Sequence, residues 1–212
     1  MTQILNSEFQ LYLYISLSKV TVVMFDKTGT ITRGQPQVTN VWISAVDFNP
    51  LIILAALGYA EKSSEHPIAF AIARYVDEVF GREITGKSEA FQAVPGCGMK
   101  CTVSALGDII KSSQNSSELR NFISYISTGS SGKFQLNDIE LEITNTQNMK
   151  LGNLIGANME SYNGVDAKYT VIIGNREWMN RNGMIIKEDV NRRMNVEEEQ
   201  GRSAVLCAIN GE

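Results

Sequence analysis

The residues of this sequence best suited to chemistry are the polar string DKTGT at positions 26–30, which follows a short apolar run at positions 21–25. An apolar, β-branched run bounded by polar residues predicts a buried strand, so Asp26 is expected just beyond its carboxyl end. A carboxylate in such a place can attack a γ-phosphoryl group and form an aspartyl-phosphate. Lys27 and the hydroxyl of Thr28 could then hold phosphate oxygens, while Gly29 lets the backbone turn tightly against the ligand. The string therefore predicts phosphoryl-transfer chemistry; the alternative interpretation is a solvated turn.

A second group of candidate residues suits nucleotide binding. His66, the only histidine, precedes Pro67 at the start of a predicted helix, and a helix N-terminus favours a phosphorylated ligand. Gly96 and Gly98 form a GxG turn, in which bare backbone can approach a ligand. Singly these are weak signals, because a lone histidine is usually a surface or core residue and a lone GxG is usually a plain turn. Their occurrence together, in this order along the chain, is stronger evidence for a nucleotide-binding site than any one of them alone.

The elements that must position these residues are a mixture of helices and strands. Helices are predicted over residues 50–63 and 67–80; the second has one apolar face, Pro67 in its first turn and Gly81 at its end. A hairpin is predicted over 91–103, and further strands over 35–43, 169–173 and 204–209. A helix broken near Asn195 is predicted over 186–200. Residues 112–162 are rich in Ser, Asn, Gln, Thr and Gly and are predicted to form a mobile insertion.

Composition narrows the class of protein. Hydrophobic residues make up 43% of the chain and charged residues 20%, which is typical of a globular protein and argues against wholesale disorder. A net charge of −4 without a dense Lys/Arg run argues against nucleic acid or an anionic membrane surface as a partner. Three cysteines fit a reducing compartment better than a disulfide scaffold. No segment reaches the roughly 18–20 apolar residues that a membrane-spanning helix needs.

In order along the chain, the motifs DKTGTIT, SEHP, VPGCG, GNREWM and EEEQGRSAVLCAINGE resemble those of the copper-transporting P-type ATPases of animals, the Menkes and Wilson type. The resemblance begins near Lys19 and has no clear motif in residues 112–162; residues 1–17 show none. It implies an ATP-binding cytoplasmic fragment of a pump that couples ATP hydrolysis, through an aspartyl-phosphate, to copper export. In the parent pump Asp26 would be the phosphorylated aspartate and would lie beside magnesium, with Lys27 and Thr28 assisting.

The resemblance also implies which residues line a pocket for the purine. Histidine in the SEHP motif would orient the adenine, and the glutamate five residues before it would approach the same base. The GxG loop would let backbone reach the nucleotide, and the asparagine of the GN pair would contact it. The implied ATP-binding residues are Glu61, His66, Gly96, Gly98, Met99, Cys101 and Asn175.

The fold class that the resemblance implies is α+β. Residues 36–203 would form a nucleotide-binding domain, an antiparallel sheet of about six strands flanked by two helical hairpins. Residues 18–35 and 204–212 would be strands of an incomplete Rossmann-like phosphorylation domain, and residues 1–17 are unassigned. Because the magnesium-holding TGDN and GDGxNDxP segments of the family do not occur in the sequence, we expect ATP binding without a stable aspartyl-phosphate and without transport.

The expected partners are ATP, magnesium and the remaining domains of the pump, with no nucleic acid and no direct membrane insertion. The fragment is expected to be cytoplasmic, and its parent an integral protein of the Golgi or plasma membrane. Two other functions remain open. One is a haloacid-dehalogenase-like phosphatase, although the usual DxD pattern would place a carboxylate where this chain has Thr28. The other is a non-catalytic regulatory fragment that competes for partners of the full pump.

Overall fold

A computed structural model describes residues 22, 24, 34–44, 49–106, 117–127, 131–144 and 167–211. The chain divides into two compact units, Met1–Gln35 and Pro36–Glu212, and all the helices and strands described here belong to the second. Asp26, Lys27 and Thr28 lie outside the described residues, so their predicted role stays a prediction. Among the described helices none is long and apolar enough to cross a bilayer.

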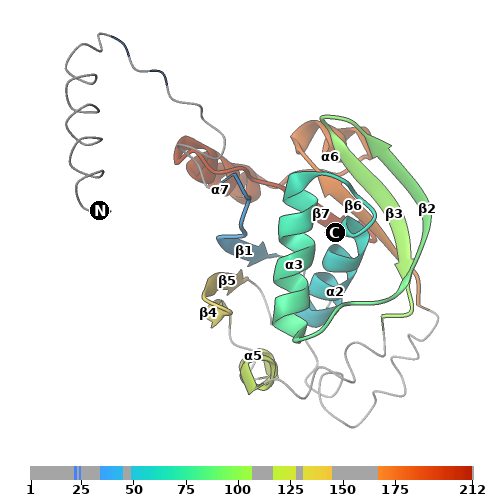
Figure 1. Cartoon of the computed structure of the whole chain (residues 1–212), viewed down its shortest axis with the longest axis vertical. Coiled ribbons are helices and arrows are strands. Elements are labelled where there is room, and N and C mark those ends of the chain that lie inside the picture. Colours follow the sequence, from blue (N-terminus) through green and yellow to red (C-terminus); the bar gives the residue numbers. More distant parts are fainter. Residues whose placement is uncertain are drawn as a thin grey trace, which may run out of the picture. The chain divides into compact units, whose positions relative to one another are not determined.

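A four-stranded antiparallel sheet forms the centre of the second unit. Its strands are β2 (Lys87–Val94), β3 (Gly98–Ser104), β6 (Tyr169–Gly174) and β7 (Leu206–Ile209), in the order β2-β3-β6-β7 (Figure 1). The predicted hairpin of β2 and β3 is present, with a short turn between Val94 and Gly98. The sequence assigned residues 204–212 to a strand of the phosphorylation domain, and that assignment stays a prediction; in the structure β7 is an edge strand of this sheet. Its residues pair with β6, Cys207 opposite Ile173 and Ile209 opposite Val171, and this pairing satisfies backbone N–H and C=O groups of both strands.

Helices α2 (Pro50–Glu61) and α3 (Pro67–Phe80) cover one face of this sheet (Figure 1). Both start as the sequence predicts: each has proline in its first turn, and the side chain of Asn49 caps α2 by accepting a hydrogen bond from Leu51 N at 2.8 Å. Gly81 ends α3 in the left-handed conformation, with φ 64°. The helices pack closely, since a Cβ on Gly58 would lie 2.6 Å from that of Val76. Alternate residues of β3 and β6, including Cys101 and Val171, are buried beneath them.

The opposite face of the sheet is covered at one end by the short helix α6 (Arg176–Arg181). Trp178 and Met179 of α6 form a small separate core with Ile172 and Ala208 of the sheet. Helix α7 (Glu188–Glu199) follows and is continuous, so the predicted break near Asn195 is wrong. Its Asn195 side chain instead accepts a hydrogen bond from Arg176 at 2.7 Å.

A second sheet contains β1 (Asn40–Ile43), β5 (Ile139–Ile143) and β4 (Gly132–Leu136), with β1 parallel to β5. Helix α5 (Ser117–Ser127) packs against β4 of this sheet. The prediction of a mobile insertion over 112–162 is therefore wrong for α5, β4 and β5. The physical reason is burial: Leu119, Phe122 and Ile126 of α5 and Leu141 of β5 are fully buried and join the same core as α2 and α3.

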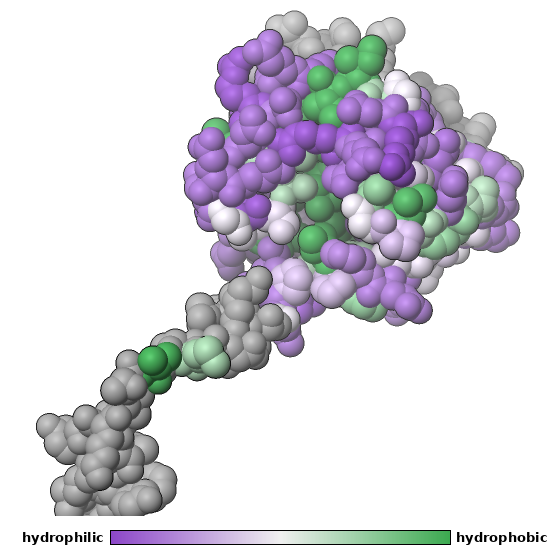
Figure 2. All heavy atoms as spheres, turned by 90° about the horizontal axis from the view of Figure 1, so that it is seen from above, coloured by the Kyte–Doolittle hydropathy of each residue, from purple (hydrophilic) through white to green (hydrophobic). Residues whose placement is uncertain are grey.

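The α+β class is confirmed, but its strands are arranged differently from the prediction. One sheet of about six strands was expected, and the described residues form one sheet of four strands and another of three. Two helical hairpins were expected. Among the described residues, one pair of consecutive helices, α2 and α3, packs closely together. On the face shown in Figure 2, hydrophilic residues predominate and hydrophobic ones gather in small separate patches.

Candidate functional site

Two glycines lie opposite each other where β3 begins and β6 ends. Gly98 pairs directly with Gly174, and the indole of Trp178 lies beside the pair. A Cβ on Gly98 would lie 2.5 Å from Trp178 Cδ1 and closer still to the carbonyl oxygen of Ile173. A Cβ on Gly174 would lie 2.8 Å from Gly98 Cα. No side chain fits at either position, so these glycines allow strands and helix to approach closely.

The side chain of Asn175 joins the GxG turn to helix α6. Its Oδ1 accepts a hydrogen bond from Trp178 N at 2.9 Å, which caps the helix, and its Nδ2 donates to the carbonyl oxygen of Gly96 at 3.0 Å. The backbone N–H of Asn175 donates to Cys97 O at 2.9 Å, and Trp178 Nε1 donates to Met99 O at 2.9 Å. The carboxamide therefore holds the turn in place, and one N–H of Nδ2 remains for a further acceptor.

Gly96 differs from Gly98 in its surroundings. It has φ +75°, a conformation that favours glycine, and nothing lies within 4 Å of a Cβ built on it. Gly96 is exposed, whereas Met99 and Cys101 on the following strand are buried. Of the two glycines of the GxG turn, Gly96 is thus the one whose backbone a ligand can approach.

Glu61 is the last residue of α2 and is only 5% exposed. Burial raises the pKa of its carboxyl to about 7. Burial also raises the pKa of the Cys101 thiol on β3, and the nearby charge of Glu61 adds to that effect. Glu61 at the end of α2 and Cys101 on β3 are therefore within electrostatic range of each other.

His66 caps helix α3. Its Nδ1 accepts a hydrogen bond from Ile68 N at 3.2 Å, and its own N–H donates to Ser64 Oγ at 3.3 Å. In the neutral ring a proton is then required on Nε2, which can donate to a ligand. The ring is exposed. Within the described part of the chain, His66 bonds to Ser64 and Ile68, and no hydrogen bond joins it to the Gly96–Asn175 group.

The predicted site residues thus fall into three sets. Gly96, Gly98, Met99 and Asn175 are held together at the start of β3. Cys101 lies further along β3, within electrostatic range of Glu61 at the end of α2, and His66 lies at the N-terminus of α3. Sequence reasoning missed two members of the first set, Gly174 and the indole of Trp178. The GN pair after an apolar strand was a signal for Gly174, because glycine at a strand end often marks close backbone approach.

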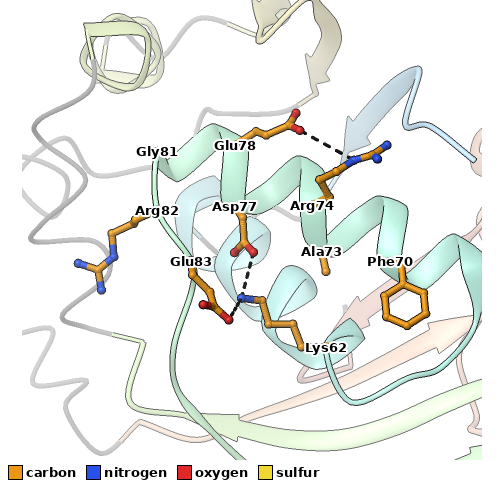
Figure 3. A pocket seen from close by; sticks show the side chains of 9 residues that line it. All are labelled: Lys62, Phe70, Ala73, Arg74, Asp77, Glu78, Gly81, Arg82 and Glu83. Atoms are coloured by element: carbon orange, nitrogen blue, oxygen red, sulfur yellow. Dashed lines mark hydrogen bonds and ion pairs between the residues drawn. The ribbon is translucent and has the colours of Figure 1, made fainter. Parts of the chain in front are cut away.

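A surface groove of about 620 Å³ lies elsewhere, along the outer side of α3 (Figure 3). Its charged side chains pair with one another: Lys62 Nζ lies 3.0 Å from Asp77 and 3.4 Å from Glu83, and Arg74 lies 3.9 Å from Glu78. None of the predicted site residues lines it. This groove is therefore separate from the candidate site.

Comparisons with known proteins agree on a family. The family model described as haloacid dehalogenase-like hydrolase matches residues 20–212. Mouse copper-transporting ATPase 1 is 38% identical over 198 residues, which is 92% of this chain and 12% of that protein. Human copper-transporting ATPase 2 is 38% identical over 195 residues, 91% of this chain and 11% of that protein. A probable copper-exporting P-type ATPase of Archaeoglobus fulgidus is 46% identical over 81 residues, 38% of this chain and 10% of that protein.

These matches confirm the resemblance expected from the motifs. The chain is similar to a segment of the copper-transporting ATPases, and it spans about a tenth of the length of these relatives.

Proposed function

The chain belongs to the haloacid dehalogenase-like hydrolase family, and from this premise we propose that it binds ATP as the nucleotide-binding part of a copper-transporting P-type ATPase. The observation that carries the proposal is the grouping at the start of β3. There an exposed glycine backbone and a carboxamide with a spare N–H lie beside the strand that also carries Cys101, next to the buried acid Glu61. Such a combination of bare backbone and a few placed polar groups suits a nucleotide.

Each residue has a distinct task in this proposal. The backbone at Gly96 and the spare N–H of Asn175 bind polar groups of the nucleotide. Met99 and Cys101, which are buried in the core, contribute indirectly by fixing the position of β3. Glu61 contacts the base, and Nε2 of His66 donates a hydrogen bond to the ligand. Gly98 acts indirectly, because it lets β3 and β6 approach closely enough to place Asn175.

Phosphoryl transfer belongs to the complete pump in this proposal. Asp26 would accept the γ-phosphoryl group there, with Lys27 and Thr28 holding phosphate oxygens, and magnesium would offset the charge on the transferring group. Among the described residues no group of three His, Cys, Asp or Glu side chains could hold a metal ion. We therefore place no magnesium in the described part, and we attribute copper transport to domains of the relatives that this chain does not span.

The test is an amide-shift titration of the labelled chain with ATP, combined with calorimetry. We expect shifts at Glu61, His66, Gly96 and Asn175, and weaker binding in His66→Ala. Because this variant also removes the cap of α3, His66→Asn is the matched control: asparagine caps a helix but offers no imidazole. Both variants should bind ATP more weakly while keeping the wild-type circular dichroism. Absence of heat with ATP in the folded wild-type protein would contradict the proposal.

The family description also fits a phosphatase, which is the second candidate. A phosphatase of the expected type needs a carboxylate two residues after its nucleophile, and this chain has Thr28 there. Hydrolysis of p-nitrophenyl phosphate that is lost in Asp26→Asn would favour the phosphatase. Absence of hydrolysis, together with ATP binding, would favour the pump fragment. Acid-stable label from γ-labelled ATP on Asp26 would contradict our expectation of binding without a stable aspartyl-phosphate.

A further inference from the structure

The ring of Phe70 stands at one end of the groove on the outer side of α3, and Gly81 lies at the other end (Figure 3). The ring is 61% exposed, whereas most apolar residues of α3 are buried. Nothing lies within 4 Å of a Cβ built on Gly81, so that end of the groove is open. A single exposed apolar residue is ordinary, and the significance of this one depends on the charges between the two ends.

The charges along the groove form one fixed group and one loosely held pair. Lys62 Nζ lies 3.0 Å from Asp77 and donates a hydrogen bond to Ile84 O at 2.9 Å. Asp77 in turn accepts a hydrogen bond from Ile84 N at 2.8 Å. Arg74 and Glu78 are 3.9 Å apart, and their side chains are 50% and 59% exposed. An exposed ion pair of this length contributes little to stability, so these two charges can exchange partners at small cost.

Arg74 and Glu78 lie one turn apart on the face of α3 that also carries Phe70, and all three are exposed. Residues four apart lie one above another on a helix. When two such faces meet antiparallel, Arg74 of one copy faces Glu78 of the other, and the reverse contact forms at the same time. The same register brings Phe70 of each copy level with Arg82 of the other, beside the open space at Gly81. The face is therefore complementary to itself in both charge and shape.

We propose that the outer face of α3 joins two copies of this chain as an antiparallel helix pair with twofold symmetry. Phe70 of each copy packs beside Gly81 of the other, and Arg74 of each copy binds Glu78 of the other. The groove has as many basic as acidic side chains, so two copies meet no net repulsion there. Self-association does not depend on the proposed nucleotide binding, because none of the predicted site residues lines the groove.

The dimer is expected to be weak because its contact is short. Helix α3 has 14 residues and is therefore about 21 Å long. One helix face of this length buries less than the roughly 1,200 Å² of a stable interface. Association should accordingly become visible at roughly 10 μM to 1 mM protein.

The first test is analytical ultracentrifugation of the full chain over that concentration range at low salt. The average mass of the wild-type protein should rise towards that of a dimer. Phe70→Ala should weaken association at least tenfold, because a central aromatic side chain carries much of the binding energy of an interface. Phe91→Ala is the matched control: Phe91 on β2 is also exposed, at 44%, but lies outside the groove. This variant should associate within about twofold of wild type, and circular dichroism should show that both variants are folded.

The second test exchanges the charges. Arg74→Glu places two acidic side chains at each of the symmetric contacts, and Glu78→Arg places two basic ones there, so each variant alone should stay monomeric. An equimolar mixture of the two variants brings an acidic face against a basic one and should restore association as a heterodimer. Inside each chain of the mixture the two charges still repel, so recovery can come only from contact between chains.

Three results would each overturn the proposal. The wild-type protein stays monomeric over the whole concentration range, Phe70→Ala associates as tightly as wild type, or the mixture of the two charge variants stays monomeric.

Discussion

The substitution Gly98→Ala, compared with Gly96→Ala, distinguishes the roles of the two glycines in the GxG turn. In the folded chain the new methyl would lie 2.5 Å from Trp178 Cδ1, 2.7 Å from Gly174 Cα and closer still to a backbone oxygen. Two of these three neighbours are backbone atoms, so no side-chain rotation relieves the clash, and β3 must move away from β6. Overpacking of this kind costs about 1–3 kcal/mol or more.

Movement of β3 away from β6 also breaks nearby hydrogen bonds. The bonds from Asn175 N to Cys97 O and from Trp178 Nε1 to Met99 O, both 2.9 Å, contribute about 1 kcal/mol each. The expected loss in free energy of unfolding for Gly98→Ala is therefore about 4 kcal/mol. Gly96→Ala is the matched control: its Cβ would meet nothing within 4 Å, and its φ of +75° costs a non-glycine residue about 1–2 kcal/mol.

Urea denaturation followed by tryptophan fluorescence measures both variants. A protein of this size loses about 2–4 °C of melting temperature per kcal/mol, so thermal melts should show a drop of about 10 °C for Gly98→Ala and about 4 °C for Gly96→Ala. Equal losses, or a larger loss for Gly96→Ala, would refute the assignment of Gly98 to close strand packing.

Three further predictions follow from single contacts. The raised pKa of Glu61, about 7 against an ordinary 4.5, means that a stability contribution present below pH 4.5 is lost as pH rises through 7. Urea unfolding at pH 5 and 8 should show a loss of about 2.5 kcal/mol, which Glu61→Gln abolishes. Asn175→Ala should cost about 2 kcal/mol in the same assay, through loss of the α6 cap and of the bond to Gly96, whereas Asn175→Asp, which keeps the capping oxygen and loses only the donor to Gly96, should cost about 1 kcal/mol. Phe122→Ala should cost about 3–5 kcal/mol, because this ring is fully buried beside Phe134 with centroids 5.3 Å apart; a loss under 1 kcal/mol would mean that α5 is not packed in the core.

Local signals explain which elements the sequence predicted well. Helix α3 runs from Pro67 to Phe80 with Gly81 as its terminating residue, because proline and glycine fix those two ends whatever the rest of the fold does. The β2–β3 hairpin follows from strand-forming residues on either side of a glycine turn. Pairing partners were less predictable: β7 pairs with β6 across a long stretch of sequence, and its composition alone does not say which edge it joins.

Residues 112–162, rich in Ser and Asn, were predicted to be a mobile insertion on their average composition. That average obscured two short patterns. Leu119, Phe122 and Ile126 lie three and four residues apart, which is the spacing of one helix face. Further on, strands β4 and β5 meet at the two-residue turn of Asn137 and Asp138, with φ 51° and 61°. Asparagine and aspartate tolerate such left-handed positions, so this turn is a hairpin signal. Reading the period rather than the composition would have found both elements.

The motif residues of the candidate site are not equivalent, and only the geometry separates them. Gly98 and Asn175 are occupied in holding β3, β6 and α6 together, so their replacement should weaken ligand binding by moving the frame. The backbone N–H of Gly96, Nε2 of His66 and the carboxyl of Glu61 have no such task among the described residues, and their chemistry is free for a ligand. A motif resemblance names all of them alike, because both tasks select the same residue types. Unfolding and binding measured on the same variants distinguish the two tasks: a frame residue changes both together, whereas a ligand-binding residue changes affinity while the free energy of unfolding stays the same or, for Glu61, increases above neutral pH.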